Sequence, residues 1–194
     1  MEETTSEVTQ TETTSQNNNA NRVGFGPRLG AYLIDFVFNA IVGSIIGMAL
    51  GATLVGIFFG SQAATGSAEG DALVGGLGAM LGGMIGTLAG IYLMSLVLFV
   101  MEGITGQTPG KMLLKIKNAN QDGTAAAAGA LWVRALLKYS GTILALLAGV
   151  TSLAILGTIG SVAGLIIFIG CFFVLGDKRQ AIHDLVAKTA VFKK

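Results

Sequence analysis

The sequence is poor in charged residues, which make up only 12% of its 194 residues, about half of their usual share in soluble domains. Hydrophobic residues make up 52%, and the mean hydropathy is +0.70. This balance excludes an ordinary soluble domain and predicts a polytopic membrane protein. The net charge is +1 and the basic residues are scattered, so nothing in the sequence indicates nucleic-acid binding.

Residues that build disulfides, metal centres and catalytic dyads are equally scarce. The chain has one cysteine, Cys171, and one histidine, His183. A lone cysteine in an apolar run offers neither a disulfide nor a thiolate metal site. His183 has no second ligand or nucleophile at a suitable spacing, so we expect a solvated or structural histidine. We therefore expect no enzyme activity, no catalytic residue, no metal and no cofactor.

Residues 1–21 lack both basic residues and apolar runs. They are rich in Thr, Glu, Gln, Asn and Ser, and they contain four glutamates. This composition predicts a disordered tail, because it offers almost nothing to bury. It also lacks the basic start and apolar core of a secretory signal. Residues 22–194 are then expected to form one transmembrane domain.

Long apolar runs predict that this domain is an all-α membrane protein with about four transmembrane helices. The last two helices are expected within a run of 38 uncharged residues, which is too long for a single crossing. The predicted spans are residues 29–60, 72–101, 133–149 and 152–175. Residues 103–132 are predicted to form a small cytoplasmic loop or hairpin, because they contain an alternating stretch and an Asp-Gly turn signal.

The terminal segment, residues 177–194, is predicted to be a short amphipathic helix lying at the interface. Asp177 is the expected N-cap, and the segment is expected to end in an extended stretch. On one side of this helix lie Ile182, Leu185, Val186 and Thr189. With four spans, all twelve basic residues of the chain fall on one side of the membrane, and the positive-inside rule puts both termini in the cytoplasm.

The first predicted span begins with a polar stripe. At 100° per residue, Arg28, Tyr32, Asp35 and Asn39 fall within an arc of about 60°. A charge in lipid is expensive, so this stripe should face protein or water. Arg28 and Asp35 are too far apart for an i,i+4 pair. Each is therefore expected to find a partner elsewhere in the chain.

Asp184 could supply such a partner, and two interpretations fit its position. It is spaced i,i+4 from Lys188, so the two side chains could simply pair at the surface. Alternatively, Asp184 reaches Arg28 or Arg134 and brings the terminal segment onto the start of the first span. The second interpretation explains why Arg28 is tolerated beside the membrane.

Glycines recur at four-residue spacing in the first two predicted spans. Small residues on one helix face let two helices approach closely. Packing within the chain is favoured over self-association, although the same faces would suit a homo-oligomer. These helix-packing candidates are Gly43, Gly47, Gly51, Gly78, Gly82, Gly86 and Gly90.

Three segments, taken in order, resemble the RDD family of bacterial membrane proteins, which is named for one arginine and two aspartates. The first is Arg-Leu-Gly-Ala-Tyr-Leu-Ile-Asp at residues 28–35. The second is Gly-Gln-Thr-Pro-Gly-Lys at residues 106–111, with Asp-Gly and Arg134 downstream; the family pattern has a residue other than proline at position 109. The third is the His-Asp pair at residues 183–184, followed by Ala-Lys-Thr.

By this resemblance, the name-giving residues correspond to Arg28, Asp35 and Asp184. The resemblance implies a multi-pass protein of the bacterial cytoplasmic (inner) membrane. It also implies a suspected transport role, which includes cation/proton exchange for some members. Family membership defines architecture better than activity.

Two functions therefore compete. In the first, a transporter, Asp35 alternates between a proton and a small cation, with Arg28 tuning it and Asn39 offering an amide oxygen. Arg134 and Asp184 complete this predicted site and charge network. In the second, a scaffold or regulatory subunit of a membrane protein partner, the same charges are structural. The lipid bilayer is the expected surrounding of both.

Overall fold

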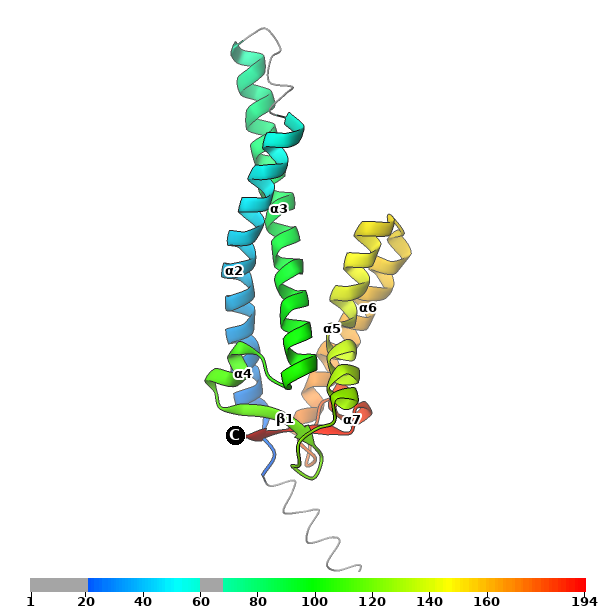
Figure 1. Ribbon diagram of the computed structural model, residues 1–194. Coiled ribbons are helices and arrows are strands. Elements are labelled where there is room, and N and C mark those ends of the chain that lie inside the picture. Colours follow the sequence, from blue (N-terminus) through cyan, green and yellow to red (C-terminus); the bar gives the residue numbers. More distant parts are fainter. Residues whose placement is uncertain (1–20, 60–67) are drawn as a thin grey trace, which may run out of the picture. The chain divides into compact units, whose positions relative to one another are not determined.

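The structure, a computed structural model, describes residues 21–59 and 68–194 (Figure 1). The chain divides into two compact units. Unit 1 comprises the residues up to Asp35 together with Leu98–Lys194, and unit 2 comprises Phe36–Val97. The predicted tail lies outside the described residues except for Asn21.

Four helices in the described residues are long and apolar enough to cross a membrane, as the apolar runs predict. They are α2 (Phe25–Phe59), α3 (Ala68–Thr105), α5 (Ala128–Thr151) and α6 (Ala154–Cys171), the last extended by the 3-10 helix η1 (Phe172–Leu175). The chain is therefore a membrane protein of mostly helical structure.

The helices extend past several of the predicted span ends. The predicted second span ends at residue 101, but α3 continues through Glu102 to Thr105. The predicted third span starts at residue 133, but α5 starts at Ala128. Helix α3 can continue because the Glu102 carboxylate is paired with basic side chains, so the helix does not have to end at the first charge.

Helices α5 and α6 form an antiparallel pair within unit 1. Ser152 connects them in the left-handed region, at a φ of 57°. A Cβ atom on Gly141 would lie 3.0 Å from the carbonyl oxygen of Gly160, so the two backbones approach closely there. Small residues therefore set the spacing of this helix pair.

In unit 2, the glycines of α2 face the glycines of α3. A Cβ atom on Gly47 would lie 2.2 Å from the carbonyl oxygen of Gly86, and one on Gly90 would lie 2.1 Å from that of Gly43. Gly51 and Gly82 face each other in the same way. Gly78 is buried. No larger residue fits at these contacts without moving a backbone.

A two-stranded antiparallel sheet lies in unit 1, where the sequence suggests a local hairpin. Strand β1 (Ile116–Asn120) pairs with β2 (Thr189–Lys193), and Ile116 is opposite Lys193. The predicted turn is present: Gly123 has a φ of 88°, and its backbone N–H donates a hydrogen bond to the carbonyl oxygen of Asn120. The hairpin prediction is nevertheless wrong, because β2 is the partner of β1. Ile116 joins Val23, Ala31 and Val191 in a small apolar core, which stabilises this long-range pairing.

The terminal segment also differs from its prediction. Helix α7 (Ile182–Val186) is only five residues long and starts after Ala181, so Asp177 is not its N-cap. Leu185 and Val186 are exposed, whereas His183 and Asp184 are buried. Exposure of Leu185 and Val186 is compatible with the predicted interfacial face, and ion pairs with buried arginines hold Asp184 inward.

Candidate functional site

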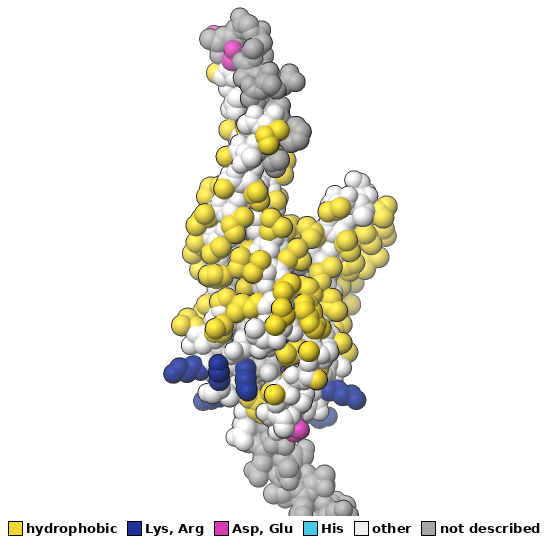
Figure 2. Space-filling view, viewed as in Figure 1, with side chains coloured by type: hydrophobic (Ala, Val, Ile, Leu, Met, Phe, Trp, Pro, Cys, Tyr) yellow, Lys and Arg dark blue, Asp and Glu magenta, His cyan; other side chains and the backbone are white. Residues whose placement is uncertain are grey.

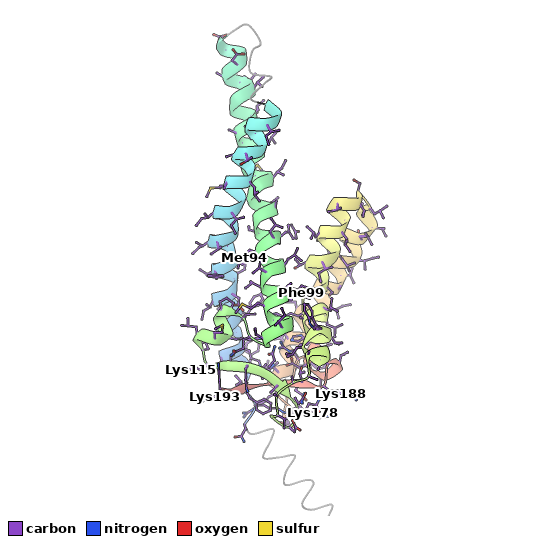
Figure 3. All side chains as sticks on the ribbon, in the orientation of Figure 1. Met94, Phe99, Lys115, Lys178, Lys188 and Lys193 are labelled. Carbon is purple, nitrogen blue, oxygen red and sulfur yellow. The ribbon has the colours of Figure 1, made fainter. Side chains whose placement is uncertain are left out.

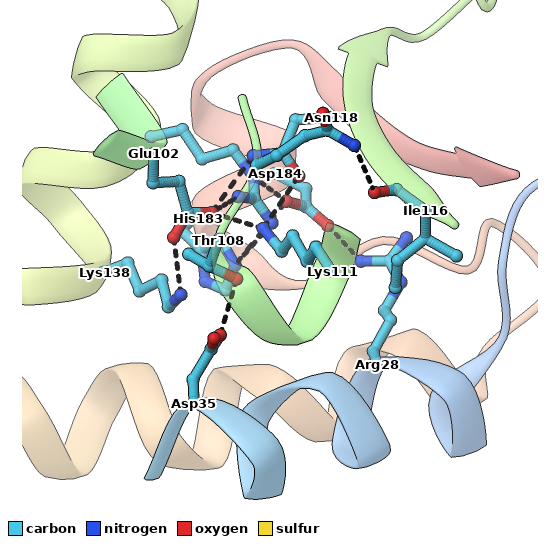
Figure 4. Close-up of polar contacts among 12 residues, drawn as sticks. Arg28, Asp35, Glu102, Thr108, Lys111, Ile116, Asn118, Lys138, His183 and Asp184 are labelled. Atoms are coloured by element: carbon cyan, nitrogen blue, oxygen red, sulfur yellow. Dashed lines mark hydrogen bonds and ion pairs between the residues drawn. The ribbon is translucent and has the colours of Figure 1, made fainter. Parts of the chain in front are cut away.

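A cluster of buried charges lies in unit 1, where α2, α3, α5, α7 and the short helix α4 (Pro109–Leu113) meet (Figure 4). Four basic side chains surround two carboxylates. We call this group the ion-pair cluster, and its members are Arg28, Glu102, Lys111, Arg134, Lys138 and Asp184.

Glu102 is the first centre of the cluster and is fully buried. One carboxylate oxygen accepts hydrogen bonds from Lys111, Arg134 and the side-chain amide of Asn118. The other accepts from Lys138 at 2.6 Å. Three cations therefore share one carboxylate, which compensates the desolvation of the Glu102 charge.

Asp184 is the second centre and is also fully buried. It accepts from Arg134 Nε at 2.6 Å and from Arg28 Nη1 at 2.5 Å. The backbone N–H of Ala181 donates to it at 3.2 Å. Of the two interpretations of Asp184, the geometry therefore matches pairing with the arginines, and Lys188 is exposed.

Arg134 joins the two centres, since it bonds to both Glu102 and Asp184. A guanidinium suits this position because its fork of N–H groups can serve two carboxylates at once. Arg28 likewise makes three bonds, donating to Asp184 and to the carbonyls of Val23 and Arg179. The cluster thus ties the start of α2 to α5 and to the segment before α7.

Asp35 has a separate role beside the cluster. Its carboxylate accepts from the Thr108 hydroxyl at 2.5 Å and from the Gly110 backbone N–H at 2.7 Å. Thr108 is the N-cap of the short helix α4 (Pro109–Leu113), and its own side chain makes no capping bond. Asp35 therefore satisfies an N-terminal amide of α4 from another helix. A Cβ on Gly110 would lie 2.2 Å from the Ala31 carbonyl oxygen, so glycine is required at this contact.

Asn39, the fifth predicted site residue, belongs to unit 2. Its amide nitrogen donates to the hydroxyl of Ser95 at 2.8 Å, and its buried oxygen has no hydrogen-bond partner in the described part of the chain. Tyr32, from the same predicted stripe, is 56% exposed. The residues of the predicted stripe therefore lie in different environments.

The local structure of the loop before β1 explains its composition. Gly106 adopts a φ of 68°, and its carbonyl accepts from the backbone N–H of Asn118. The side chain of Asn118 bonds to both Lys111 and Glu102. This segment thus folds back on itself and positions the ammonium group of Lys111 in the cluster.

Burial and nearby charges shift the pKa values of site residues that lie outside the long helices. Desolvation and the nearby charge of Arg134 lower the pKa of Lys111 to about 7, although Glu102 opposes this shift. Desolvation lowers the pKa of His183 to about 3, so the ring is neutral at pH 7. Burial alone would raise the pKa of Asp184, but the charge of Arg134, followed by those of His183 and Arg28, lowers it well below its usual range.

His183 is buried beside the cluster, so it is not the solvated histidine of one sequence interpretation. Its Nε2 atom lies 3.4 Å from a guanidinium nitrogen of Arg134. Its Nδ1 atom has no hydrogen-bond partner in the described residues. A neutral ring that accepts from Arg134 is consistent with a structural histidine.

Sequence reasoning missed Glu102, Lys111 and Lys138 as site residues. Glu102 was visible as the charge at the end of an apolar run, and Lys111 as part of the second RDD-like segment. Neither signal predicts which side chains meet. Among the described residues, no group of three or more His, Cys, Asp or Glu is arranged to hold a metal ion.

The four membrane-length helices and the buried polar cluster define a polytopic membrane protein with an ion-pair network at helix ends. The family model described as RDD family matches residues 22–188, which is most of the chain. The chain therefore belongs to the RDD family. No curated protein and no solved structure gives a significant match to it.

Proposed function

We propose that the ion-pair cluster is a structural network and that this chain is a non-catalytic scaffold or regulatory subunit in the membrane. The observation that carries the proposal is the saturation of both carboxylates. Each oxygen of Glu102 and of Asp184 already accepts at least one charged donor. Such a network specifies one arrangement of the helix ends that it joins.

The charge balance also favours this proposal over a cation site. Four basic side chains meet two carboxylates in the cluster. A small cation would have to displace an ammonium or guanidinium group and would face the remaining positive charges. Asp35 offers no better place, because its two oxygens accept from Thr108 and Gly110. Two open surface hollows of about 500 and 280 Å³ lie elsewhere in unit 1 and are not lined by cluster residues.

Variants of Asp184 and Asp35 test the structural role. Asp184→Asn leaves Arg28 and Arg134 buried with less compensation, so we expect a lower melting temperature and lower abundance. Asp35→Asn keeps an acceptor for Gly110, so its loss should be smaller. Thermal unfolding of the purified proteins in detergent measures both. Variants as stable as the wild type would contradict the proposal.

Proton-coupled transport, such as cation/proton exchange, is the second candidate, and the burial of Lys111 favours it. The Lys111 ammonium bonds to Glu102 and Asn118 inside the cluster, and desolvation together with the charge of Arg134 lowers its pKa to about 7. In this version Lys111, rather than Asp35, is the proton site. Proteoliposomes with wild type or Lys111→Met, at matched folded content, test it by proton and cation flux. Equal flux from the two proteins would exclude Lys111 as the proton site.

The proposal includes a location, the cytoplasmic membrane of a bacterium with both termini inside. All twelve basic residues belong to unit 1, and the positive-inside rule places such residues in the cytoplasm. Single cysteines at exposed positions such as Lys194, in a Cys171→Ala background, test this orientation. Labelling of intact cells by an impermeant maleimide at position 194 would contradict it.

A further inference from the structure

One structural pattern occurs twice in unit 1. Helix α4, Lys115 and β1 follow one another, as do α7, Lys188 and β2. Both short helices have five residues, as do both strands. Lys115 and Lys188 both lie in the left-handed region, at φ values of 54° and 52°. The chain thus builds the same helix, lysine and strand arrangement from two different sequences.

The pairing of β1 with β2 shows the same repeat. Residue 116 starts β1 and residue 189 starts β2, and each is opposite the last residue of the other strand. The central pair, Asn118 and Val191, consists of equivalent positions. The register is therefore that of a local pseudo-two-fold axis. The third residues of the two short helices, Lys111 and Asp184, are equivalent too, and both are buried in the ion-pair cluster.

Both short helices, together with the C-cap residue Leu114 of α4, expose apolar side chains. This is unusual at a protein surface that faces water alone. The exposed fractions are 52% for Met112, 69% for Leu113, 37% for Leu114, 38% for Leu185 and 60% for Val186.

Each short helix also packs against the end of a predicted membrane span. The side chain of Leu114 lies beside Gly30, near the start of α2, at 3.2 Å from an ideal Cβ position. Ile182 of α7 lies beside Gly170, near the end of α6. These contacts put both exposed apolar patches at the level of a span end, where acyl chains give way to headgroups.

A lysine follows each apolar patch, although glycine adopts this backbone conformation more easily. Lys115 and Lys188 are exposed and make no ion pair among the residues described. Figure 3 shows Lys115 and Lys193 at one end of the β1–β2 ribbon and Lys188 toward the other. In Figure 2, Lys and Arg side chains form a band at this end of unit 1.

We propose that α4 with Lys115 and α7 with Lys188 are two equivalent binding sites for anionic phospholipid. The apolar side chains of each short helix enter the edge of the acyl-chain region, and the ammonium group that follows binds the headgroup phosphate. Charge complementarity selects an anionic lipid over a zwitterionic one, because neither ammonium group has an acidic partner among the described residues.

Lipid retention by the full-length protein tests this proposal. Native mass spectrometry of protein from detergent micelles doped with phosphatidylglycerol or phosphatidylcholine counts the lipids that stay bound. We expect two retained phosphatidylglycerol molecules per chain, one in Lys115→Gly or Lys188→Gly, and none in the double variant. Glycine suits both backbone positions, and the melting temperature of each variant verifies its fold.

A double variant at Lys117 and Lys194, both to glutamine, is the matched control for net charge and should retain both lipids. If a glycine variant unfolds, the double variant Lys115→Gln, Lys188→Gln repeats the test without increasing the flexibility of the backbone. Three results would overturn the proposal: equal retention of phosphatidylcholine by the wild type, unchanged retention in the double variants at 115 and 188, or equal loss in the control.

Discussion

Different interactions stabilise each of the two units of this protein. In unit 2, α2 and α3 contact each other backbone against backbone at facing glycines, and the Asn39 side chain donates a hydrogen bond to Ser95. In unit 1, long-range ion pairs and hydrogen bonds join helix ends, a loop and a terminal segment. Close packing of small residues thus dominates in unit 2, whereas unit 1 must also satisfy buried charges.

This difference follows from what each region has to bury. Lipid does not drive apolar helices together, so close packing of small residues stabilises a helix pair such as that of unit 2. Helix ends and loops carry polar backbone and charged side chains, and these need partners when they are buried. The two units should therefore respond differently to substitutions, which the following predictions test.

Glu102→Gln should have the largest effect, because Lys111, Arg134 and Lys138 would lose their shared counter-charge. We expect a loss of about 3 to 5 kcal/mol in the free energy of unfolding, typical of breaking a buried ion pair. Chemical denaturation in detergent measures it. Asp177→Asn, at an exposed position, is the control and should change stability by less than about 0.5 kcal/mol. Equal effects of the two variants would mean that unit 1 does not depend on its ion pairs.

Gly86→Ala should come next and tests the packing of unit 2. The new Cβ would lie 2.3 Å from the carbonyl oxygen of Gly47, so the helices must separate. We expect a loss near the upper end of overpacking effects, about 3 kcal/mol. Gly83→Ala is the matched control, because nothing lies within 4 Å of its Cβ position, and it should stabilise the helix by about 0.5 to 1 kcal/mol. A stable Gly86→Ala protein would contradict close backbone packing.

Thr108→Val should have an intermediate effect in unit 1. It removes the hydroxyl that donates to Asp35 but keeps the side-chain shape. Loss of a hydrogen bond to a charged group should lower the free energy of unfolding by about 2 kcal/mol. Thr124→Val, in an exposed turn, provides the comparison. A thermal shift no larger than that of the comparison would indicate that Asp35 does not need this partner.

At neutral pH His183 should give the smallest effect, because its contribution to stability changes only in acid. Its pKa is about 3 in the folded protein against 6.5 when unfolded, so the unfolded state binds more protons between these values. Stability contributed by the neutral ring is therefore complete above about pH 6.5 and falls as the pH drops toward 3, by at most about 1.4 kcal/mol per pH unit. His183→Gln should flatten this part of the pH profile of melting temperature. An unchanged slope would mean that other groups cause the acid sensitivity.

Hydropathy alone predicts the four long helices, because a span needs about 20 apolar residues whatever surrounds it. The ion-pair cluster could be predicted only in part. The family resemblance indicates Arg28 and Asp184, but the pairing of Glu102 with Lys111 and Lys138 depends on how separate segments fold together. The pairing of β1 with β2 could not be predicted either, since no local pattern identifies the partner of a five-residue strand.

The polarity of α7 shows a further limit. Sequence periodicity places Leu185 and Val186 on the apolar side of an interfacial helix, which predicts that they face lipid. It does not predict that Asp184, on the same short helix, turns inward to buried arginines. Near a membrane, the exposed face of a short helix has an apolar environment of its own, so hydrophobicity no longer distinguishes inside from outside.

The bond between Arg28 and Asp184 sets an order of events during synthesis. The two residues are 156 positions apart, and translation at about 5 to 20 residues per second separates their appearance by roughly 8 to 30 s. Arg28 therefore emerges with the first span, but its carboxylate partner emerges only after the fourth. During this interval the nascent chain carries an arginine at the membrane edge without that partner, and water or lipid headgroups must solvate it until the terminal segment arrives.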